Sequence, residues 1–112
     1  MDVVIELRQY ATATGKVPFA LWLTGLEDSK TQARIAARLD RVSAGNFGDC
    51  KPVGGGVQEI RIDYGPGYRV YFAMTGSQQV LLLSGGTKRR QAADIARAIE
   101  YLKDFKHRSA KP

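Results

Sequence analysis

The sequence predicts an α+β fold in which helices pack on a small, mostly antiparallel sheet of four strands. Apolar residues recur with helical spacing in three segments, and β-branched and aromatic residues gather in four others. Gly-rich turns separate the last three strand-like segments, as in a meander of hairpins. The expected order of elements is therefore β-α-α-β-β-β-α, with the helices packed on the sheet.

The first half of the chain is expected to hold one strand and two helices. Residues 3–9, VVIELRQ, begin with the β-branched residues typical of a strand. Pro18 suits the first turn of a helix, where its missing N–H costs nothing. Ser29 and Gln32 have the spacing of a capping box that opens a second helix, and Gly45 is placed to end it. The apolar stripes of the two helices are Phe19, Trp22, Leu23 and Leu26, and then Ile35, Leu39 and Val42.

The second half is expected to hold a loop, three strands and a final helix. Residues 46–56 are rich in Gly and Pro, which predicts a loop. A helix is expected over about residues 88–105, followed by a short basic tail, about residues 106–112, that frays. The three strands are expected at residues 57–64, 68–75 and 79–84.

Length and charge limit the possible functions. The 112 residues fit one compact domain spanning positions 1–112. Lys and Arg outnumber Asp and Glu by 17 to 11, and the formal net charge of +6 favours a phosphate-rich or acidic partner. Such a charge also promotes solubility, so the placement of the charges must decide. The single cysteine and the lack of a signal peptide or membrane span predict a reducing, cytoplasmic location.

One face of the predicted hairpin is polar. Because side chains alternate along a strand, the apolar residues of both strands share one face and leave the other free. This polar face is either a binding site or a solvated surface with cross-strand ion pairs worth ~0.2–1 kcal/mol each. It is expected to hold Glu59, Arg61, Asp63, Arg69 and Tyr71.

The turn of this hairpin, Gly-Pro-Gly at residues 65–67, predicts the register of its strands. This register holds if Tyr64 pairs with Tyr68 across the turn. The cross-strand neighbours expected from this register are Asp63 with Arg69 and Arg61 with Tyr71.

A second basic feature lies where the last strand meets the final helix. Thr87 is a plausible N-cap, so residues 88–90, KRR, would occupy the first helical turn. The helix dipole disfavours cations there by ~0.3–1 kcal/mol each. Three bases beside exposed N–H groups are instead typical of an anion site. Because the third and fourth strands are adjacent, this site is expected near Arg61 and Arg69.

Several enzyme classes are excluded because the sequence lacks their motifs. GGTK at residues 85–88 does not match the nucleotide-binding pattern G-x-x-x-x-G-K-[ST], because Thr precedes Lys. The sequence contains neither H-E-x-x-H nor G-x-S-x-G, and no Cys/His set has the spacing of metal ligands. His107, the only histidine, and Cys50 are more simply explained as surface and loop residues than as catalytic groups.

Three segments taken together carry a resemblance to a known family. They are FALWLTGLED, NFGDCKPVGGGVQEIRIDYGPGYRVYF and LLLSGGTKRRQAADI. In this order, E-I/L-R, G-Y-R-V-Y-F and L-x-G-G-x-K-x-x-Q form a specific combination. The chain resembles the RelE/ParE superfamily of toxin–antitoxin toxins, especially its phage-related addiction module killer branch, close to HigB-type toxins.

The resemblance implies a RelE-like fold and a small RNase that cleaves mRNA, in many members on the ribosome, without metal or nucleotide cofactor. The ribose 2′-OH attacks the neighbouring phosphate, and basic residues stabilise the developing charge. Arg69 matches the arginine of the family's Tyr-Arg hairpin motif, and Arg61 matches a basic residue on the preceding strand. Lys88 and Arg89 match the basic pair after the fourth strand. Glu59 completes the predicted catalytic set. The predicted RNA-binding residues are Lys51, Tyr71, Arg90, Lys103 and Lys106.

The chain departs from this family pattern at two positions. Glu59 stands where some ribosome-dependent relatives carry a lysine, and Ile95 stands where they place a tyrosine. The general acid and base therefore stay open. The candidates, in falling preference, are Glu59, Lys51, Tyr71, Asp94 and His107.

Two other functions remain open beside the RNase. One is a ParE-like toxin that inhibits DNA gyrase by binding, and the other is a nucleic-acid-binding domain whose active site has decayed. For the toxin functions the resemblance also implies a cognate antitoxin, expected to be a helix-turn-helix protein through which the pair binds its operator DNA. No membrane partner is expected.

Overall fold

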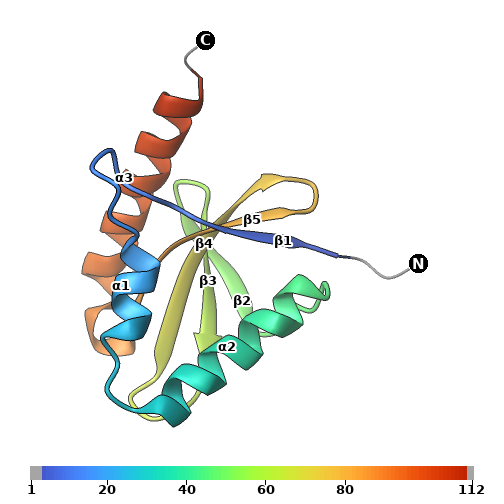
Figure 1. The fold of residues 1–112 in the computed structure, drawn as a ribbon, viewed down its shortest axis with the longest axis vertical. Coiled ribbons are helices and arrows are strands. Elements are labelled where there is room, and N and C mark those ends of the chain that lie inside the picture. Colours follow the sequence, from blue (N-terminus) through green and yellow to red (C-terminus); the bar gives the residue numbers. More distant parts are fainter. Residues whose placement is uncertain (1–3, 111–112) are drawn as a thin grey trace.

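The protein, described for residues 4–110 by a computed structural model, has a five-stranded sheet with helices on both faces (Figure 1). The strand order is β1-β5-β4-β3-β2, and β1 runs parallel to β5 while every other neighbouring pair is antiparallel. The elements are β1 (Glu6–Gln9), α1 (Pro18–Thr24), α2 (Ser29–Ser43), β2 (Cys50–Gly54), β3 (Val57–Ile62), β4 (Tyr68–Gly76), β5 (Gln79–Thr87), the 3₁₀ turn η1 (Lys88–Arg90) and α3 (Gln91–Ser109).

The α+β class is confirmed, but the predicted sheet of four strands and the order β-α-α-β-β-β-α are wrong by one strand. Part of the expected loop at residues 46–56 forms β2, which pairs with β3 at the edge of the sheet. Pro52 makes this segment look like a loop in the sequence, because proline is rare inside sheets. Proline is accepted at a sheet edge, which is where β2 lies. The predicted first strand, residues 3–9, begins at Glu6 in the structure, and Val3 lies outside the described residues.

The sheet separates two apolar cores. On one face, α1 and α2 cover side chains that include Ile60, Val70 and Leu82. On the other face, α3 covers a second cluster that includes Tyr71, Leu83 and Leu102. The polar face predicted for the hairpin is the α3 face, so the first turns of α3 lie against it instead of leaving it open to solvent.

The two N-terminal helices begin with different devices. Pro18 is the first residue of α1, as predicted. The predicted capping box of Ser29 with Gln32 is wrong, because Asp28 caps α2. The Asp28 carboxylate accepts hydrogen bonds from the Lys30 N–H at 3.0 Å and the Thr31 hydroxyl at 2.9 Å. A carboxylate is a strong acceptor at the positive end of a helix, which explains why the cap lies one residue earlier.

The ends of α2 and α3 also differ from each other. Gly45, with φ of 93°, follows the last turn of α2 and donates its N–H to the Val42 carbonyl, as expected of a terminating glycine. The final helix was expected to end near residue 105, but α3 continues to Ser109. Fraying is therefore a wrong prediction for residues 106–109.

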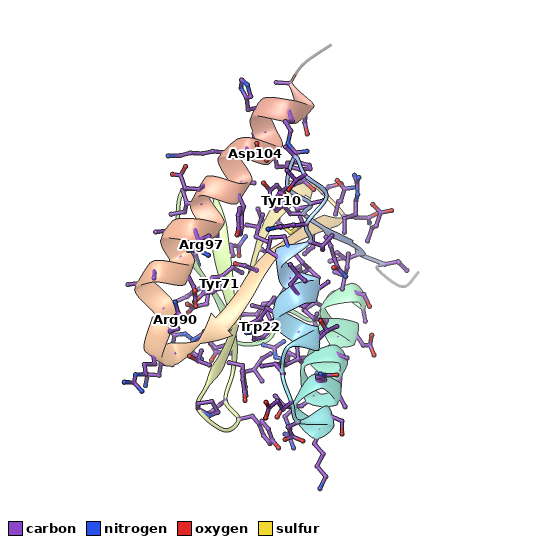
Figure 2. The ribbon with its side chains drawn as sticks, turned by 60° about the vertical axis from the view of Figure 1, so that its left-hand side comes forward. Tyr10, Trp22, Tyr71, Arg90, Arg97 and Asp104 are labelled. Atoms are coloured by element: carbon purple, nitrogen blue, oxygen red, sulfur yellow. The ribbon has the colours of Figure 1, made fainter. Side chains whose placement is uncertain are left out.

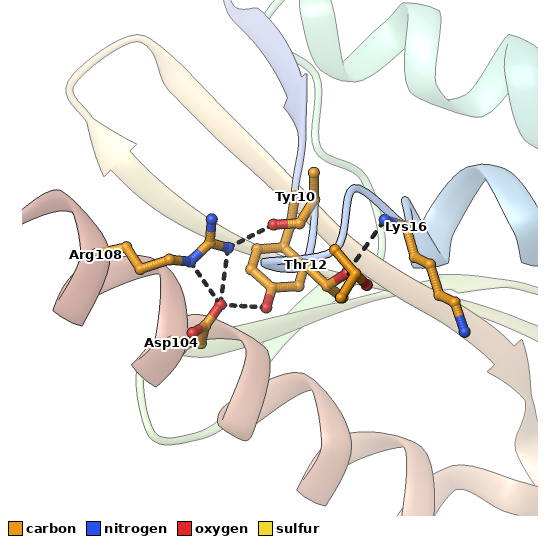
Figure 3. Close-up of polar contacts among 7 residues, drawn as sticks. Tyr10, Thr12, Lys16, Asp104 and Arg108 are labelled. Carbon is orange, nitrogen blue, oxygen red and sulfur yellow. Dashed lines mark hydrogen bonds and ion pairs between the residues drawn. The ribbon is translucent and has the colours of Figure 1, made fainter.

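A polar cluster holds the C-terminal end of α3 against the segment after β1 (Figure 3). The Asp104 carboxylate accepts the Tyr10 hydroxyl and two donors of Arg108, Nε at 3.0 Å and Nη2 at 2.8 Å. Arg108 also donates to the Ala11 carbonyl, and the Tyr10 ring stacks on Tyr101 with centroids 5.0 Å apart. The hydrogen bonds from Tyr10 and Arg108 lower the pKa of Asp104, while burial and Asp104 raise the pKa of Tyr10. These contacts explain why the basic end of the chain is helical.

Candidate functional site

The register of the β3–β4 hairpin differs from the predicted one by two residues. Tyr68 pairs with Ile62 instead of Tyr64, so Arg61 lies opposite Arg69 and Glu59 opposite Tyr71. Tyr64 belongs to the turn and packs its ring under the Arg34 guanidinium, 4.2 Å from the ring centroid. Because the shift is even, the polar residues keep the predicted face.

Glu59 is the centre of the polar face and is fully buried. Its Oε1 lies 3.1 Å from Arg61 Nε and 3.7 Å from Arg69 Nε. Its Oε2 accepts a hydrogen bond of 2.7 Å from Gln91 Nε2, in the first turn of α3. One carboxylate thus links β3, β4 and α3. Removal of the carboxylate or of its arginine partners from such a buried ion pair leaves an uncompensated charge.

The two arginines differ in their access to solvent. Arg69 is only 8% exposed, and its Nη1 donates to the Tyr68 carbonyl at 3.1 Å. The Arg61 side chain is 33% exposed and presents the outward edge of the pair. Arg61 is therefore the arginine of this cluster that an incoming ligand reaches first.

Lys88 joins this cluster through the β3–β4 turn. Its backbone N–H donates to the Gly67 carbonyl at 2.8 Å. A Cβ placed on Gly67 would lie 3.4 Å from Lys88 Cβ and 3.5 Å from Arg69 Nη1, so the two side chains flank the same small residue. The predicted meeting of the strand arginines with the start of the final helix is thus present for Arg61, Arg69 and Lys88.

Buried polar atoms beneath the start of α3 have no hydrogen-bond partner within the described residues. They include Arg69 Nε, the Tyr71 hydroxyl and Ser84 Oγ, and Tyr71 lies directly opposite Ser84 across β4 and β5. Burial, together with the charges of Glu59 and Asp94, raises the pKa of Tyr71 well above its ordinary value. Unpaired buried polar atoms are uncommon in native proteins, and their concentration here marks this region as a candidate site.

The other predicted site residues fall into two groups. Lys51 lies on β2 directly opposite Glu59 and is exposed, at the edge of the same polar face. Arg89 and Arg90 are exposed on η1. In contrast, Lys103 pairs with Glu100 at 3.6 Å on the outer surface of α3.

Lys106 and His107 are also distant from the cluster. At a rise of 1.5 Å per residue, Lys106 lies about 22 Å along α3 from Gln91. A Cβ on Gly56, in the β2–β3 turn, would lie 3.7 Å from its Nζ. The structure therefore separates Lys103, Lys106 and His107 from the arginine cluster.

The expected cap and start of the final helix are corrected in detail. Thr87 precedes a 3₁₀ turn, and its side chain makes no capping hydrogen bond. Lys88, Arg89 and Arg90 form this turn, so Gln91 begins α3 and reaches Glu59. Gln91 was missed as a site residue, although it is the last residue of the L-x-G-G-x-K-x-x-Q pattern. Ser84 was missed because the predicted strand ended there.

Two other kinds of site are absent from the part of the chain that the structure describes. No helix within residues 4–110 is long and apolar enough to cross a membrane. No group of three or more His, Cys, Asp or Glu side chains in the same range is arranged to hold a metal ion.

Comparisons with known proteins identify one family and one similar protein. The model of the family described as "Phage derived protein Gp49-like (DUF891)" matches residues 22–103, which include the whole arginine cluster. A Haemophilus influenzae protein described as uncharacterized is 46% identical over 80 residues, covering 71% of this chain and 81% of the relative. The matched region begins at Trp22 and ends within α3, so it contains both faces of the β3–β5 sheet. On this basis the chain belongs to the Gp49-like family of phage-derived proteins.

Proposed function

We propose that this chain is the toxin of a type II toxin–antitoxin system of the RelE/ParE kind, and that it cleaves mRNA in the cytoplasm without a metal ion. The observation that carries the proposal is the convergence of Arg61 and Arg69 on the buried Glu59, with Lys88 beside Arg69 across Gly67. Cations from two strands and a helix start form a surface that suits a phosphodiester. The family membership and the formal charge of +6 support the same function.

In this proposal the arginines share the work unequally. The exposed edge of Arg61 and the Lys88 ammonium bind the scissile phosphate and stabilise the charge on its oxygens as the 2′-OH attacks. Arg69, buried between Glu59 and the Tyr68 carbonyl, holds the local charge and geometry. Glu59 is a positioning residue, because it is buried and bonded to Arg61 and Gln91.

Burial also changes the order of the acid and base candidates. Glu59 and Tyr71 are fully buried, and His107 is far along α3. Lys51 is exposed beside Glu59 on the edge strand, and an ammonium there can donate a proton to the departing 5′-oxygen. The bond from phosphorus to the 5′-oxygen then breaks as the bond to the 2′-oxygen forms and the 2′-OH proton passes to solvent water, giving a cyclic phosphate and a 5′-hydroxyl.

The test is inducible expression in bacteria of the wild-type chain and of Arg61→Gln, Lys88→Gln and Lys51→Gln. Lys51 and Lys88 are exposed and Arg61 is half-exposed, so no buried side chain is replaced, and Arg69 still faces Glu59 in Arg61→Gln. We expect growth arrest and new mRNA 5′-ends with the wild type, and a loss of cleavage of ~100-fold or more with Arg61→Gln, as for removal of a charge-stabilising donor. Lys103→Gln, on the outer surface of α3, is the matched control.

Each result of this experiment is informative. Intact mRNA during arrest by the wild type would contradict the RNase. Loss of cleavage by Lys103→Gln as strong as that by Arg61→Gln would contradict the assignment of the site. Circular dichroism of the purified variants separates a loss of fold from a loss of function.

A second function is favoured by the burial of Glu59 and Tyr71. If neither group can move a proton, the same cationic surface would act by binding, either as a ParE-like gyrase inhibitor or as a decayed nucleic-acid-binding domain. Arrest with DNA damage and intact mRNA would support gyrase inhibition. No arrest, with retained RNA binding, would support the decayed domain.

The proposal includes a partner. A toxin of this kind requires a cognate antitoxin, and the exposed Arg61 and Lys88 suit acidic side chains of such a protein. We expect the adjacent reading frame to encode a small helix-turn-helix protein that binds operator DNA. Co-expression with that protein should restore growth, and charge reversal by Arg61→Glu should weaken the complex measured by calorimetry.

A further inference from the structure

A pocket of about 310 Å³ lies at the end of β5, between α1 and the first turns of α3. Figure 2 shows Trp22 on α1 and Arg90 and Arg97 at the start of α3, on the two sides of this strand. β1 pairs with β5 only up to Leu82, so the part of β5 that lines the pocket has a strand neighbour on one side only. The pocket is lined by Trp22, Gly85, Gly86, Thr87, Arg90, Asp94 and Arg97.

Two glycines make this pocket possible by their size. A Cβ on Gly85 would lie 2.1 Å from the Trp22 ring, and a Cβ on Gly86 would lie 2.0 Å from Asp94 Oδ2. Neither glycine has a positive φ, so the chain needs them here for space and not for backbone freedom. They allow an indole from one face of the sheet and a carboxylate from the other to meet at the same point of β5.

Asp94 is the unusual group in this pocket. Its carboxylate makes no hydrogen bond or ion pair within the described residues, although Arg90, at the end of η1, and Arg97, on α3, are only four and three residues away. Oδ2 is buried against Gly86 without a partner. Burial raises the pKa of Asp94, and the charges of Arg90 and Arg97 oppose this rise. A half-buried carboxylate without donors is costly unless a bound group supplies them.

The three kinds of side chain in the pocket match three parts of one ligand class. The Trp22 ring offers a stacking surface for a base, Asp94 offers an acceptor for the amino group of a base, and the two guanidinium groups suit a phosphate. An acidic peptide would be attracted by the arginines but repelled by Asp94. A basic peptide would be attracted by Asp94 but repelled by the arginines. A nucleotide satisfies all three at once.

We propose that this pocket binds a nucleotide of single-stranded RNA whose base carries an exocyclic amino group. The inference rests on the proposed RNase function, to which it adds a recognition subsite. Arg69 and Gly86 are paired across β4 and β5, and Arg61 is one strand further, so Arg61 is about 10 Å from Gly86 at the ordinary strand spacing. An extended RNA strand covers that distance within one or two nucleotides, so the subsite reads a base close to the scissile phosphate.

The wild-type chain carries its own probe, because Trp22 is its single tryptophan. We expect AMP, CMP and GMP to quench the fluorescence of the purified protein, with UMP, which lacks the amino group, binding more weakly. Inorganic phosphate should compete with the nucleotides without quenching. If none of the four nucleotides changes the fluorescence at millimolar concentration, the proposal is overturned.

Substitutions assign the contacts. Asp94→Asn should abolish the preference of AMP, CMP and GMP over UMP, and Arg97→Ala should weaken the four nucleotides alike while leaving adenosine binding unchanged. Trp22→Phe should weaken binding by less than the roughly five- to 150-fold expected for loss of a stacking ring. The control is Arg41→Ala, an exposed arginine on α2, and an equal effect of this change would overturn the assignment.

The subsite and the RNase can fail separately. Quenching with the expected base preference, but no mRNA cleavage, would leave the nucleotide pocket standing and remove the proposed reaction. Cleavage that depends on Arg61 but is accompanied by no quenching would remove the pocket. If both hold, Asp94→Asn should change the base found next to the cut sites without abolishing cleavage.

Discussion

The two ends of α3 are attached to the rest of the fold in different ways. At the C-terminal end, Asp104 accepts hydrogen bonds from Tyr10 and Arg108, and Arg108 also reaches the Ala11 carbonyl. At the N-terminal end, one hydrogen bond from Gln91 reaches the sheet, and Asp94 is left without a donor within the described residues. The polar side chains of α3 are thus hydrogen-bonded at its C-terminal end, whereas Asp94 near its N-terminal end has no hydrogen-bond donor within the described residues.

This difference separates structural from functional chemistry along a single helix. The paired end gives order to a basic segment that the sequence predicts to fray. The unpaired end lies beside buried charges and buried polar atoms that have no hydrogen-bond partner. Such atoms destabilise the fold, and a bound ligand that forms hydrogen bonds with them would offset that cost. Both proposals place RNA at the unpaired end.

The largest expected effect is at the buried carboxylate of the unpaired end. Glu59→Ala should lower the free energy of unfolding by ~3–5 kcal/mol, because it leaves Arg69 buried without its counter-charge. Urea unfolding followed by circular dichroism measures this loss. Glu100→Ala removes an exposed pair with Lys103 and should cost less than ~1 kcal/mol. Equal losses in the two variants would show that burial does not distinguish the pairs.

A smaller effect is expected from the glycines that bring Trp22 and Asp94 together. Gly85→Ala forces the rigid indole to move and should cost ~1–3 kcal/mol. Gly86→Ala should cost less, because the end of the Asp94 side chain can turn away, and combining it with Asp94→Ala should remove most of the penalty. Gly76→Ala has room and should stay within ~0.5 kcal/mol, as measured by the same unfolding curves.

The smallest effect is a pH dependence at the paired end. The folded-state pKa of Asp104 is lowered, so its stabilisation is present above the unfolded pKa of about 3.9 and is lost as the pH falls through the folded pKa. Asp104→Asn should therefore flatten the fall of the thermal midpoint between about pH 5 and pH 2. A fall of the same size in Asp104→Asn and in the wild type would contradict the assignment.

The parts of the fold that depend on local patterns could be predicted from the sequence. The apolar stripes placed the three helices, and alternation along the strands placed Glu59, Arg61 and Arg69 on one face. The edge strand β2 could not be recognised, because Pro52 and the neighbouring glycines give it the composition of a loop.

The details of the site depended on long-range contacts that local patterns do not contain. The register failed because Tyr64 takes part in the turn, where Arg34 of α2 packs on its ring. Glu59 accepts a hydrogen bond from Gln91, which is 32 residues further along the chain. The hydrogen bond between Tyr10 and Asp104 joins residues 94 positions apart, and no local sequence pattern at either residue predicts it.

The parallel pairing of β1 with β5 has a consequence for synthesis. Glu6 leaves the ribosome before its sheet partner Gln79, which follows 73 residues later. At about 5–20 residues per second, the nascent N-terminal strand waits several seconds for its neighbour. The polar cluster around Glu59 also includes Gln91, so it forms only after the segment from Glu6 to Gln91 has been synthesised.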